Sequence, residues 1–323
     1  MNEALLNLED IFKARKRISE LVIETPLVKS NILSQLFGIN LYLKCEFMQE
    51  VGSFKIRGAS NKALYEIEKG FEGDLFVTAS SGNHGIAVAY LAKKLNKKAV
   101  IFAPTVATSY KLSLIQSYGG EIIYKGEYSD QATVFAKEYA KERNGLFIHA
   151  FDDLRVIEGQ ATIALELIEQ LKNIDYVIIP VGGGGLIAGI SFVIKEISKK
   201  TKIIAVQPEG NPSLYNALKS GEIITTKGTN TIAEGLAVRR IGDLVFKIVK
   251  DRVDEVALVS EEEIINATKL LFEKERILIE PSAGAAISYL LKHKLEKESK
   301  AVAILTGRNL SKEHIEKIFS YSG

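Results

Sequence analysis

Cysteine, tryptophan and methionine are scarce in this chain of 323 residues. Cys45 is the only cysteine, so an internal disulfide is impossible, and a zinc ribbon, which needs several cysteines, is excluded. Tryptophan is absent, and methionine occurs only at Met1 and Met48, which excludes a methionine-rich ligand surface. A chain of this length can bury enough apolar surface to hold a core without a disulfide or a metal.

Long apolar runs and a charge excess are lacking as well. Lys and Arg number 42 and Asp and Glu number 40, a formal charge of +2, so we expect no dedicated nucleic-acid partner. No apolar run reaches the about 18 residues of a transmembrane helix, so we expect no membrane partner. Residues 1–18 mix acids and bases and lack the apolar core of a signal peptide, which favours the cytoplasm. The absence of Gly-Lys-Ser and Gly-Lys-Thr excludes a P-loop.

What the chain does contain is an alternation of short apolar runs and longer amphipathic ones. The short runs are nearly all apolar, as strands covered on both faces are. They predict strands at Asn40–Lys44, Leu75–Ala79, Ala99–Ala103, Glu121–Tyr124, Tyr176–Val181, Lys202–Val206 and Val302–Thr306. The longer runs predict helices at Gly85–Leu95, Gln131–Arg143, Ile157–Lys172 and Leu186–Lys199. This alternation predicts an α/β fold with a parallel sheet and right-handed crossovers.

The first of three unusual strand-to-helix turns is the glycine run Gly182–Gly185, in YVIIPVGGGGLIAG. Four glycines let several backbone N–H groups point at one anion, and the following helix adds its positive end, so a phosphate is the predicted occupant. A tight turn without a ligand is the alternative. Gly183, Gly185 and Ala188 also satisfy G-x-G-x-x-A, so a nicotinamide dinucleotide is a runner-up. That fingerprint requires an acidic residue at the position that Gln207 occupies in this chain.

The second turn is ASSGNHG, residues 79–85. Ser80, Ser81 and Asn83 offer hydroxyl and amide groups at a helix N-terminus, which suits a carboxylate or a ring oxygen. Plain N-capping is the alternative, and it needs only one such residue. His84 taken alone indicates a packed or solvated histidine more often than a catalyst.

The third turn, GSFKIRGA at residues 52–59, places Lys55 between Phe54 and Ile56 at the start of a helix. The helix dipole and partial desolvation there favour the neutral amine that attacks carbonyls, although a lone lysine is usually a solvated charge. Taken together, a reactive lysine, a glycine turn for phosphate and a Ser/Asn loop are the parts that a pyridoxal 5′-phosphate site requires.

At these residues the sequence resembles the fold type II pyridoxal-phosphate enzymes, and within them the threonine dehydratase/serine racemase family. The similarity runs along nearly the whole chain, through ETPL, LKCE, GSFKIRGA, SSGNHG, VIEGQA, PVGGGGL, TIAEGLAV and LIEPSAGA in this order. The resemblance implies a tryptophan synthase β-like fold, with two open, parallel-rich sheets flanked by helices and the cofactor in the interdomain cleft. It also implies a large domain of residues 1–70 and 146–323 and a small domain of residues 71–145 inserted in it. Biosynthetic threonine dehydratases carry a C-terminal regulatory domain as well, which we do not expect here.

The resemblance implies three groups of site residues. Lys55 forms the Schiff base. Further contacts with the cofactor come from Phe54, Asn83, Gly182, Gly183, Gly184, Gly185, Leu186, Gly235 and Thr306, with Glu280 beneath the site. The substrate carboxylate is bordered by Ser80, Ser81, Asn83 and His84.

Thr306 gives the implied chemistry its direction. A hydroxyl facing the pyridine nitrogen cannot hold a proton there as an aspartate would, so the ring is a weaker electron sink and β-elimination is favoured over transamination. The implied activity is that of a dehydratase, or ammonia-lyase, in which Lys55 removes the α-proton and the β-hydroxyl leaves. Threonine then gives 2-oxobutyrate and ammonia, and serine gives pyruvate and ammonia.

Ser81 keeps other activities open. The family's racemases have a serine here, able to act as an acid on the face opposite Lys55, whereas many dehydratases have alanine. Serine racemase or hydroxyaspartate dehydratase is therefore an alternative main activity; a nicotinamide-dependent dehydrogenase and a non-catalytic amino-acid sensor are more distant ones. We expect a small amino-acid substrate and a homodimer or higher homo-oligomer.

Four positions depart from the family pattern. The family's divalent-cation site uses acids where this chain has Gln207 and Ser213, so we expect no metal there. Glu50 replaces a basic residue of animal racemases, so nucleotide activation is not expected. Arg308 takes the middle place of the usual Gly-Gly-Asn, where it either extends into the site or points to solvent.

Overall fold

The computed structural model describes residues 6–105 and 110–321. The chain forms two compact units. Unit 1 consists of Met1–Ile23 and Gln49–Gln160, and unit 2 consists of Glu24–Met48 and Ala161–Gly323. None of the described helices is both long enough and apolar enough to cross a membrane.

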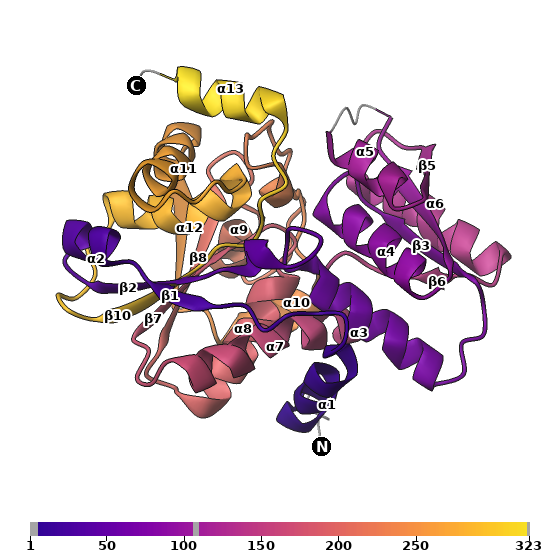
Figure 1. Ribbon diagram of the computed structural model, residues 1–323, viewed down its shortest axis with the longest axis horizontal. Coiled ribbons are helices and arrows are strands. Elements are labelled where there is room, and N and C mark those ends of the chain that lie inside the picture. The colour runs from indigo at the N-terminus through magenta and orange to yellow at the C-terminus, as the bar shows by residue number, and fades with distance from the viewer. Residues whose placement is uncertain (1–5, 106–109, 322–323) are drawn as a thin grey trace. The chain divides into compact units, whose positions relative to one another are not determined.

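Unit 1 contains a four-stranded parallel sheet in the order β5-β4-β3-β6. Its strands are β3 (Leu75–Ala79), β4 (Lys98–Ala103), β5 (Gly120–Tyr124) and β6 (Leu146–Phe147). Its helices are α1 (Leu8–Ile18), α3 (Lys55–Glu68), α4 (Asn83–Lys94), α5 (Tyr110–Ser117), α6 (Ser129–Glu142) and the first part of α7 (Leu154–Gln170), and several are labelled in Figure 1.

The two central strands of unit 1, β3 and β4, are almost entirely apolar, as expected for strands whose two faces are both covered. Phe76 and Ile101 pack with Ile86 of α4 in one core cluster, whereas Val77 and Phe102 point the other way and pack against α6. Alternate residues of a strand face opposite sides, so a strand that is buried on both sides loses the polar half of its pattern.

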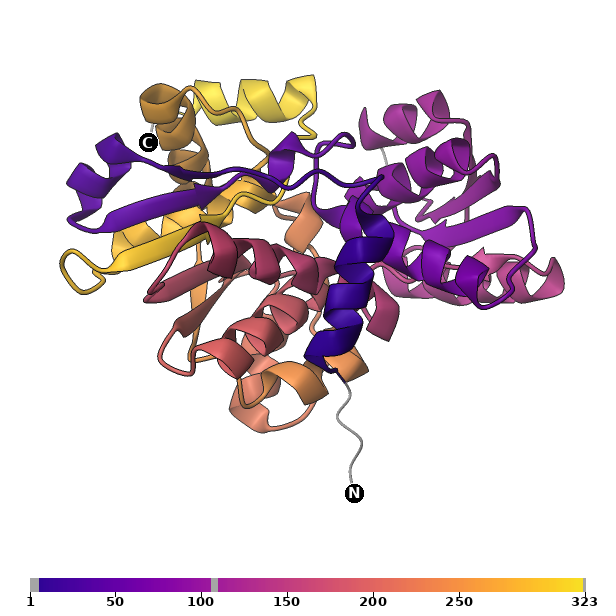
Figure 2. The ribbon, with the colours of Figure 1, turned by 60° about the horizontal axis from the view of Figure 1, so that its bottom comes forward.

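Unit 2 contains a six-stranded sheet in the order β1-β2-β10-β7-β8-β9, in which only the pair of β1 and β2 is antiparallel. The strands are β1 (Leu27–Lys29), β2 (Asn40–Lys44), β7 (Tyr176–Pro180), β8 (Lys202–Pro208), β9 (Glu255–Val259) and β10 (Lys300–Ile304). Figure 2 gives a second view of this sheet and its helices. These are α2 (Asn31–Phe37), the second part of α7, α8 (Gly185–Ile197), α9 (Ser213–Ser220), α10 (Asp243–Val249), α11 (Glu261–Glu275), α12 (Pro281–Lys292) and α13 (Lys312–Ser320), with short 3₁₀ turns η1 (Glu46–Met48) and η2 (Glu234–Leu236).

The predicted α/β fold with two parallel-rich sheets is confirmed. Each predicted strand exists with its ends within one or two residues, and each predicted helix matches α4, α6, α7 or α8. Strands β1, β6 and β9 were not predicted. β1 and β6 have only 3 and 2 residues, which is too short for a clear strand pattern. β9 contains the apolar run Val256–Val259, and the sequence reading missed it.

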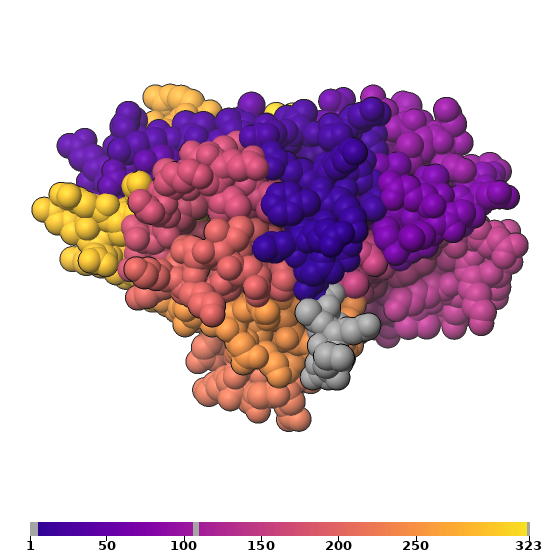
Figure 3. All heavy atoms as spheres, turned by 90° about the horizontal axis from the view of Figure 1, so that it is seen from below, coloured from indigo at the N-terminus to yellow at the C-terminus, as the bar shows by residue number. Residues whose placement is uncertain are grey.

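The two compact units do not follow the boundaries that the sequence suggested after residues 70 and 145. Unit 1 also contains α1, α3 and residues 146–160. α3 packs on α4, and α1 packs on α3 through Ile11, Ala14 and Ile18, which are buried. The other face of α1 is exposed, and its atoms lie among the indigo spheres at the surface in Figure 3.

Cys45 follows β2 and lies in the apolar core of unit 2, where 2% of it is exposed. Burial raises the pKa of its thiol to about 12, so the thiolate does not form near neutral pH. Cys45 therefore packs in the core and is not a nucleophile.

Candidate active site

Lys55 is the first residue of α3. Its Nζ donates a hydrogen bond to the Ala150 carbonyl oxygen at 2.8 Å and lies 5.2 Å from the centre of the Phe54 ring. Phe54 precedes the helix and supplies no side-chain cap, so the positive end of α3 lies next to the lysine. Sequence reasoning placed Lys55 at a helix start, and the structure agrees.

Two close approaches of backbone set the position of α3 against α7. A Cβ on Gly58 would lie 2.8 Å from the Val156 carbonyl oxygen, and a Cβ on Gly159 would lie 2.7 Å from the Gly58 Cα. The glycines of the GSFKIRGA and VIEGQA motifs thus let the two helices touch at their backbones. A side chain at either position would push α3, and Lys55 with it, away from α7.

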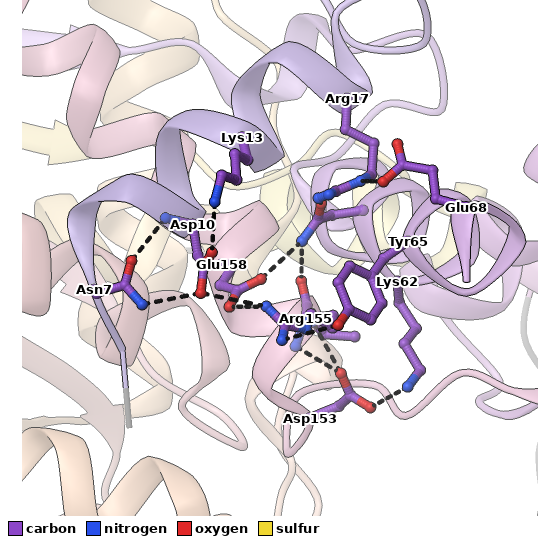
Figure 4. A network of polar contacts seen from close by, with 12 residues as sticks. Asn7, Asp10, Lys13, Arg17, Lys62, Tyr65, Glu68, Asp153, Arg155 and Glu158 are labelled. Carbon is purple, nitrogen blue, oxygen red and sulfur yellow. Dashed lines mark hydrogen bonds and ion pairs between the residues drawn. The ribbon is translucent and has the colours of Figure 1, made fainter. Parts of the chain in front are cut away.

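A polar network continues along the same face of α3 (Figure 4). The Arg155 guanidinium lies 4.0 Å from the Tyr65 ring centre, and its Nη1 lies 2.6 Å from a Glu158 oxygen. Asn61 of α3 donates to the Arg155 carbonyl at 2.6 Å and accepts from Arg17 of α1 at the same distance. Burial raises the pKa of Glu158 while Arg155 opposes that rise. The network joins α1 and α7 to α3, the helix that begins with Lys55.

The Ser/Asn loop also lies in unit 1, between β3 and α4. Ser80 Oγ accepts from the Gly82 N–H at 3.1 Å, Ser81 follows in the same bend, and α4 begins at Asn83. A Cβ on Gly85 would lie 2.9 Å from the Ser80 carbonyl oxygen, so this tight turn requires a glycine. Hydroxyl, amide and backbone N–H groups thus gather at a helix N-terminus, as the sequence predicted.

His84 follows Asn83 and is buried. Its Nε2 lies 3.0 Å from the Ile148 carbonyl oxygen, so Nε2 carries the proton and donates. Burial, and after it the positive charge of Lys55, lower the pKa of His84 to about 3. Nδ1 is then an unprotonated acceptor, and it has no hydrogen-bond partner within the described part of the chain. The same is true of Ser53 Oγ, two residues before Lys55.

The segment that receives Lys55 and His84, residues 148–152, was not found by sequence reasoning. Its Ile148 N–H donates to the Val77 carbonyl at 2.8 Å, which extends β6 along β3. His149 Nδ1 accepts from the Phe151 and Asp152 N–H groups at 3.2 and 2.8 Å and closes a tight turn. Burial lowers the pKa of His149 to about 4, which keeps the imidazole neutral. In the sequence this segment is marked only by a lone histidine in HAFDD, and such a signal is too weak to predict a functional segment.

In unit 2, the glycine run Gly182–Gly185 connects β7 to α8. Gly184 has φ +91°, and a Cβ on it would lie 2.5 Å from Val245. A Cβ on Gly182 would lie 2.7 Å from the Gly235 carbonyl oxygen. Because α8 begins at Gly185, the N–H groups of its first turn, Leu186 included, have no acceptor inside the helix. This turn is a cradle of backbone donors at a helix N-terminus, which suits a phosphate.

Three further predicted residues lie at the same end of the unit 2 sheet. The Gly235 N–H donates to Ser282 Oγ at 2.9 Å, and its carbonyl borders Gly182, so Gly235 lies beside the glycine run. Thr306 follows β10 and is almost fully buried. The next residue, Gly307, accepts from the Glu280 N–H at 3.1 Å. Ser282, in the LIEPSAGA motif, was not among the predicted residues. Arg308, for which two positions were open, is exposed.

The family model for pyridoxal-phosphate-dependent enzymes matches residues 18–307. The chain belongs to this family. Its cofactor is pyridoxal phosphate, and the alternative of a nicotinamide-dependent enzyme is set aside. The residues present suit this cofactor: a lysine at a helix start, a glycine turn that side chains would fill, and the buried unpaired His84 Nδ1 and Ser53 Oγ beside the lysine.

Curated relatives in this family match nearly the whole chain. The L-threonine ammonia-lyase of Thermotoga maritima is 38% identical over 317 residues, which covers 98% of this chain and 79% of the relative. The serine racemase of Dictyostelium discoideum is 38% identical over 322 residues, which covers 98% of this chain and 99% of the relative. Among solved structures, maize serine racemase is similar with a TM-score of 0.91 and 33% identity, over 98% of each chain. These matches confirm the resemblance and the fold type II architecture.

Proposed function

We propose that this enzyme is a threonine/serine ammonia-lyase, which converts L-threonine to 2-oxobutyrate and ammonia, and L-serine to pyruvate and ammonia. The names of the similar enzymes support this activity. The observation that carries the proposal is that Lys55 and the Ser/Asn loop meet on one short segment: Lys55 donates to Ala150 and His84 to Ile148. A general base and a loop suited to a carboxylate are thereby held together within one unit.

Each predicted residue receives a proposed role. Lys55 would hold the cofactor covalently with Phe54 beside it, and Asn83 and Gly235 would contact its ring. N–H groups of Gly182, Gly183, Gly184, Gly185 and Leu186 would bind its phosphate. The Thr306 hydroxyl would be the partner of its ring nitrogen. When bound, pyridoxal phosphate withdraws electrons from the substrate α-carbon.

The proton steps fall to residues of the chain. The amine of Lys55 would act as the general base that removes the substrate α-proton. The Ala150 carbonyl then accepts a hydrogen bond from the resulting ammonium, in the geometry seen here at 2.8 Å. The β-hydroxyl takes a proton and leaves as water, and a later hydrolysis consumes one water and releases ammonia. The overall reaction therefore has no net change in water.

The substrate carboxylate is bound by donors of the Ser/Asn loop: the hydroxyls of Ser80 and Ser81, the Asn83 amide and the N–H groups of the first turn of α4. His84 contributes only through its backbone N–H, because its single side-chain proton is donated to Ile148 and its pKa of about 3 keeps it neutral.

A screen of threonine, serine and 3-hydroxyaspartate for 2-oxo acid release tests the activity. Release from threonine or serine supports the proposal, and preferential release from 3-hydroxyaspartate would replace it with hydroxyaspartate dehydratase. A protein that binds pyridoxal phosphate and releases 2-oxo acid from none of them would contradict it and favour an amino-acid sensor.

Serine racemase is the second candidate, and one observation favours it. Ser81 lies in the bend that leads to Asn83, where its hydroxyl can serve as the acid opposite Lys55. The D. discoideum relative carries that name. Chiral analysis of L-serine incubations tests it, and failure to detect D-serine would remove it.

A cytoplasmic homodimer is part of the same proposal and rests on the family resemblance. Light scattering of the purified protein measures its mass against the 35.6 kDa of one chain.

A further inference from the structure

Gln207, at the end of β8, is fully buried, and its amide makes four hydrogen bonds. Nε2 donates to the Val181 carbonyl and to Ser213 Oγ, both at 3.2 Å. Oε1 accepts from the Leu214 and Tyr215 N–H groups at 2.9 and 3.0 Å. A carbonyl oxygen can only accept and an N–H can only donate, so the partners fix which end of the amide is nitrogen.

The four bonds connect two parts of unit 2. The Leu214 and Tyr215 N–H groups belong to the first turn of α9, and Pro212, which precedes that helix, supplies no side-chain cap. Gln207 caps α9 from a neighbouring strand instead. Val181 directly precedes the glycine run, so its carbonyl fixes the plane of the peptide whose N–H belongs to Gly182. The side chain of Gln207 therefore joins the start of α9 to the glycine run.

A divalent cation does not suit this position. The amide nitrogen of Gln207 carries two protons and has no lone pair available for a metal, and it lies between two oxygens that a cation would otherwise contact. Within the described residues, no three His, Cys, Asp or Glu side chains come together in a way that could hold a metal ion. The family's cation site, with acids in place of Gln207 and Ser213, is thus filled here by protein atoms.

We propose that Gln207 is a positioning residue: without a metal ion, its side chain holds the glycine run in place for the cofactor phosphate. This inference rests on the phosphate-binding role proposed for Gly182–Gly185. It follows that cofactor affinity in the native enzyme is independent of Mg²⁺, and that Gln207→Glu creates a cation requirement. Glutamate keeps the acceptor for α9, but above the pKa of its carboxyl it places a negative oxygen against the Val181 carbonyl, and a bound cation relieves the repulsion.

The test is a titration of apoenzyme with pyridoxal phosphate, followed by the absorbance of the Schiff base, in EDTA and in millimolar Mg²⁺. For the native enzyme the two dissociation constants should agree within about twofold. For Gln207→Glu the affinity in EDTA should fall by about tenfold or more and be restored by Mg²⁺, an effect that a purely structural defect would not produce. Gln207→Glu combined with Ser213→Asp should strengthen the dependence on Mg²⁺.

Two variants serve as controls. Gln207→Leu removes the four hydrogen bonds of the amide without adding a charge. Its affinity for pyridoxal phosphate should therefore fall, and Mg²⁺ should not restore it. Gln116→Glu adds the same charge at an exposed position of α5 and should change nothing. Native enzyme that loses affinity in EDTA and regains it with Mg²⁺ would overturn the inference, as would a Gln207→Glu affinity that Mg²⁺ leaves unchanged. Because only binding is measured, an enzyme that binds the cofactor but turns over no hydroxy amino acid would contradict the proposed activity alone.

Discussion

Lys55 and His84 bind carbonyl oxygens of two residues that stand only two positions apart, Lys55 Nζ at Ala150 and His84 Nε2 at Ile148. The Ile148 carbonyl also accepts from Thr78 Oγ1 at 2.7 Å, at the end of β3. A movement of residues 148–150 would therefore displace the lysine and the Ser/Asn loop together.

Replacing Lys55 tests the assignment of the Schiff base. We expect Lys55→Ala to show no Schiff-base absorbance and to lose at least roughly a thousandfold in kcat, because both the covalent link and the base are gone. Borohydride treatment of the native enzyme should attach the cofactor to the peptide that contains Lys55. Lys69→Ala, at the exposed end of α3, is the matched control and should retain both properties. A thousandfold loss in the control, or a labelled peptide elsewhere, would contradict the assignment.

Gly184 tests the phosphate cradle. Gly184→Ala meets two obstacles, the φ of +91° and the contact with Val245, so we expect lower stability and at least about a tenfold loss of cofactor affinity. Gly221→Ala is matched to it, since Gly221 has φ +79° with nothing within 4 Å of the added Cβ. This control should cost about 1 kcal/mol of unfolding free energy and leave cofactor affinity unchanged. Equal effects of the two variants on affinity would count against a phosphate at Gly184.

The pKa values of His84 and His149 predict acid sensitivity. Both fall from the ordinary 6.5, to about 3 and about 4, so in this range the unfolded chain binds protons that the folded chain does not. Their stabilising effect is complete above pH 6.5 and is lost as the pH falls towards the folded values, by up to about 1.4 kcal/mol per pH unit for each histidine. Denaturant unfolding between pH 7 and pH 5 measures this slope. His149→Asn retains an acceptor for Phe151 and Asp152 and should reduce the slope; an unchanged slope would show that His149 is not responsible.

The pair of Arg155 and Glu158 tests the network under α3. Arg155→Met leaves the buried Glu158 carboxylate without its main partner and should cost roughly 2–3 kcal/mol of unfolding free energy. Adding Glu158→Gln should recover part of that loss, because the remaining group is neutral. Chemical denaturation of the two single variants and the double variant gives the coupling. Additive effects would mean that the pair does not interact.

Ser81→Ala separates the two candidate activities. Racemisation needs an acid opposite Lys55, whereas elimination does not. We therefore expect D-serine formation to fall by about two orders of magnitude, while 2-oxo acid release falls much less because the other donors of the Ser/Asn loop still bind the carboxylate. Both products are measured in one incubation of L-serine. A parallel loss of both would mean that Ser81 serves carboxylate binding and not proton transfer.

Local patterns were enough to predict the strands of the two sheet interiors and the three turns. Strands such as β3 and β7 are covered on both faces, so their apolar runs appear in any reading of the sequence. The glycine run, the ASSGNHG turn and Lys55 at a helix start can each be recognised from a few consecutive residues. Turn chemistry of this kind depends on backbone angles and helix ends, which a few consecutive residues determine.

The relations that support the site have no local pattern. The Ala150 carbonyl accepts a hydrogen bond from Lys55, which lies 95 residues away in the chain. The Val181 carbonyl accepts one from Gln207, which lies 26 residues away. Glycine is required at positions 58 and 159 only because the backbones of α3 and α7 touch there. The pKa of His84 is low because the folded unit buries its side chain. Hydrogen bonds and desolvation at such separations depend on which elements pack together. The sequence pattern by itself therefore indicated the chemistry of the site. Tertiary packing determined which carbonyl groups and helix caps contact the site residues, and it buried the histidines that stay neutral.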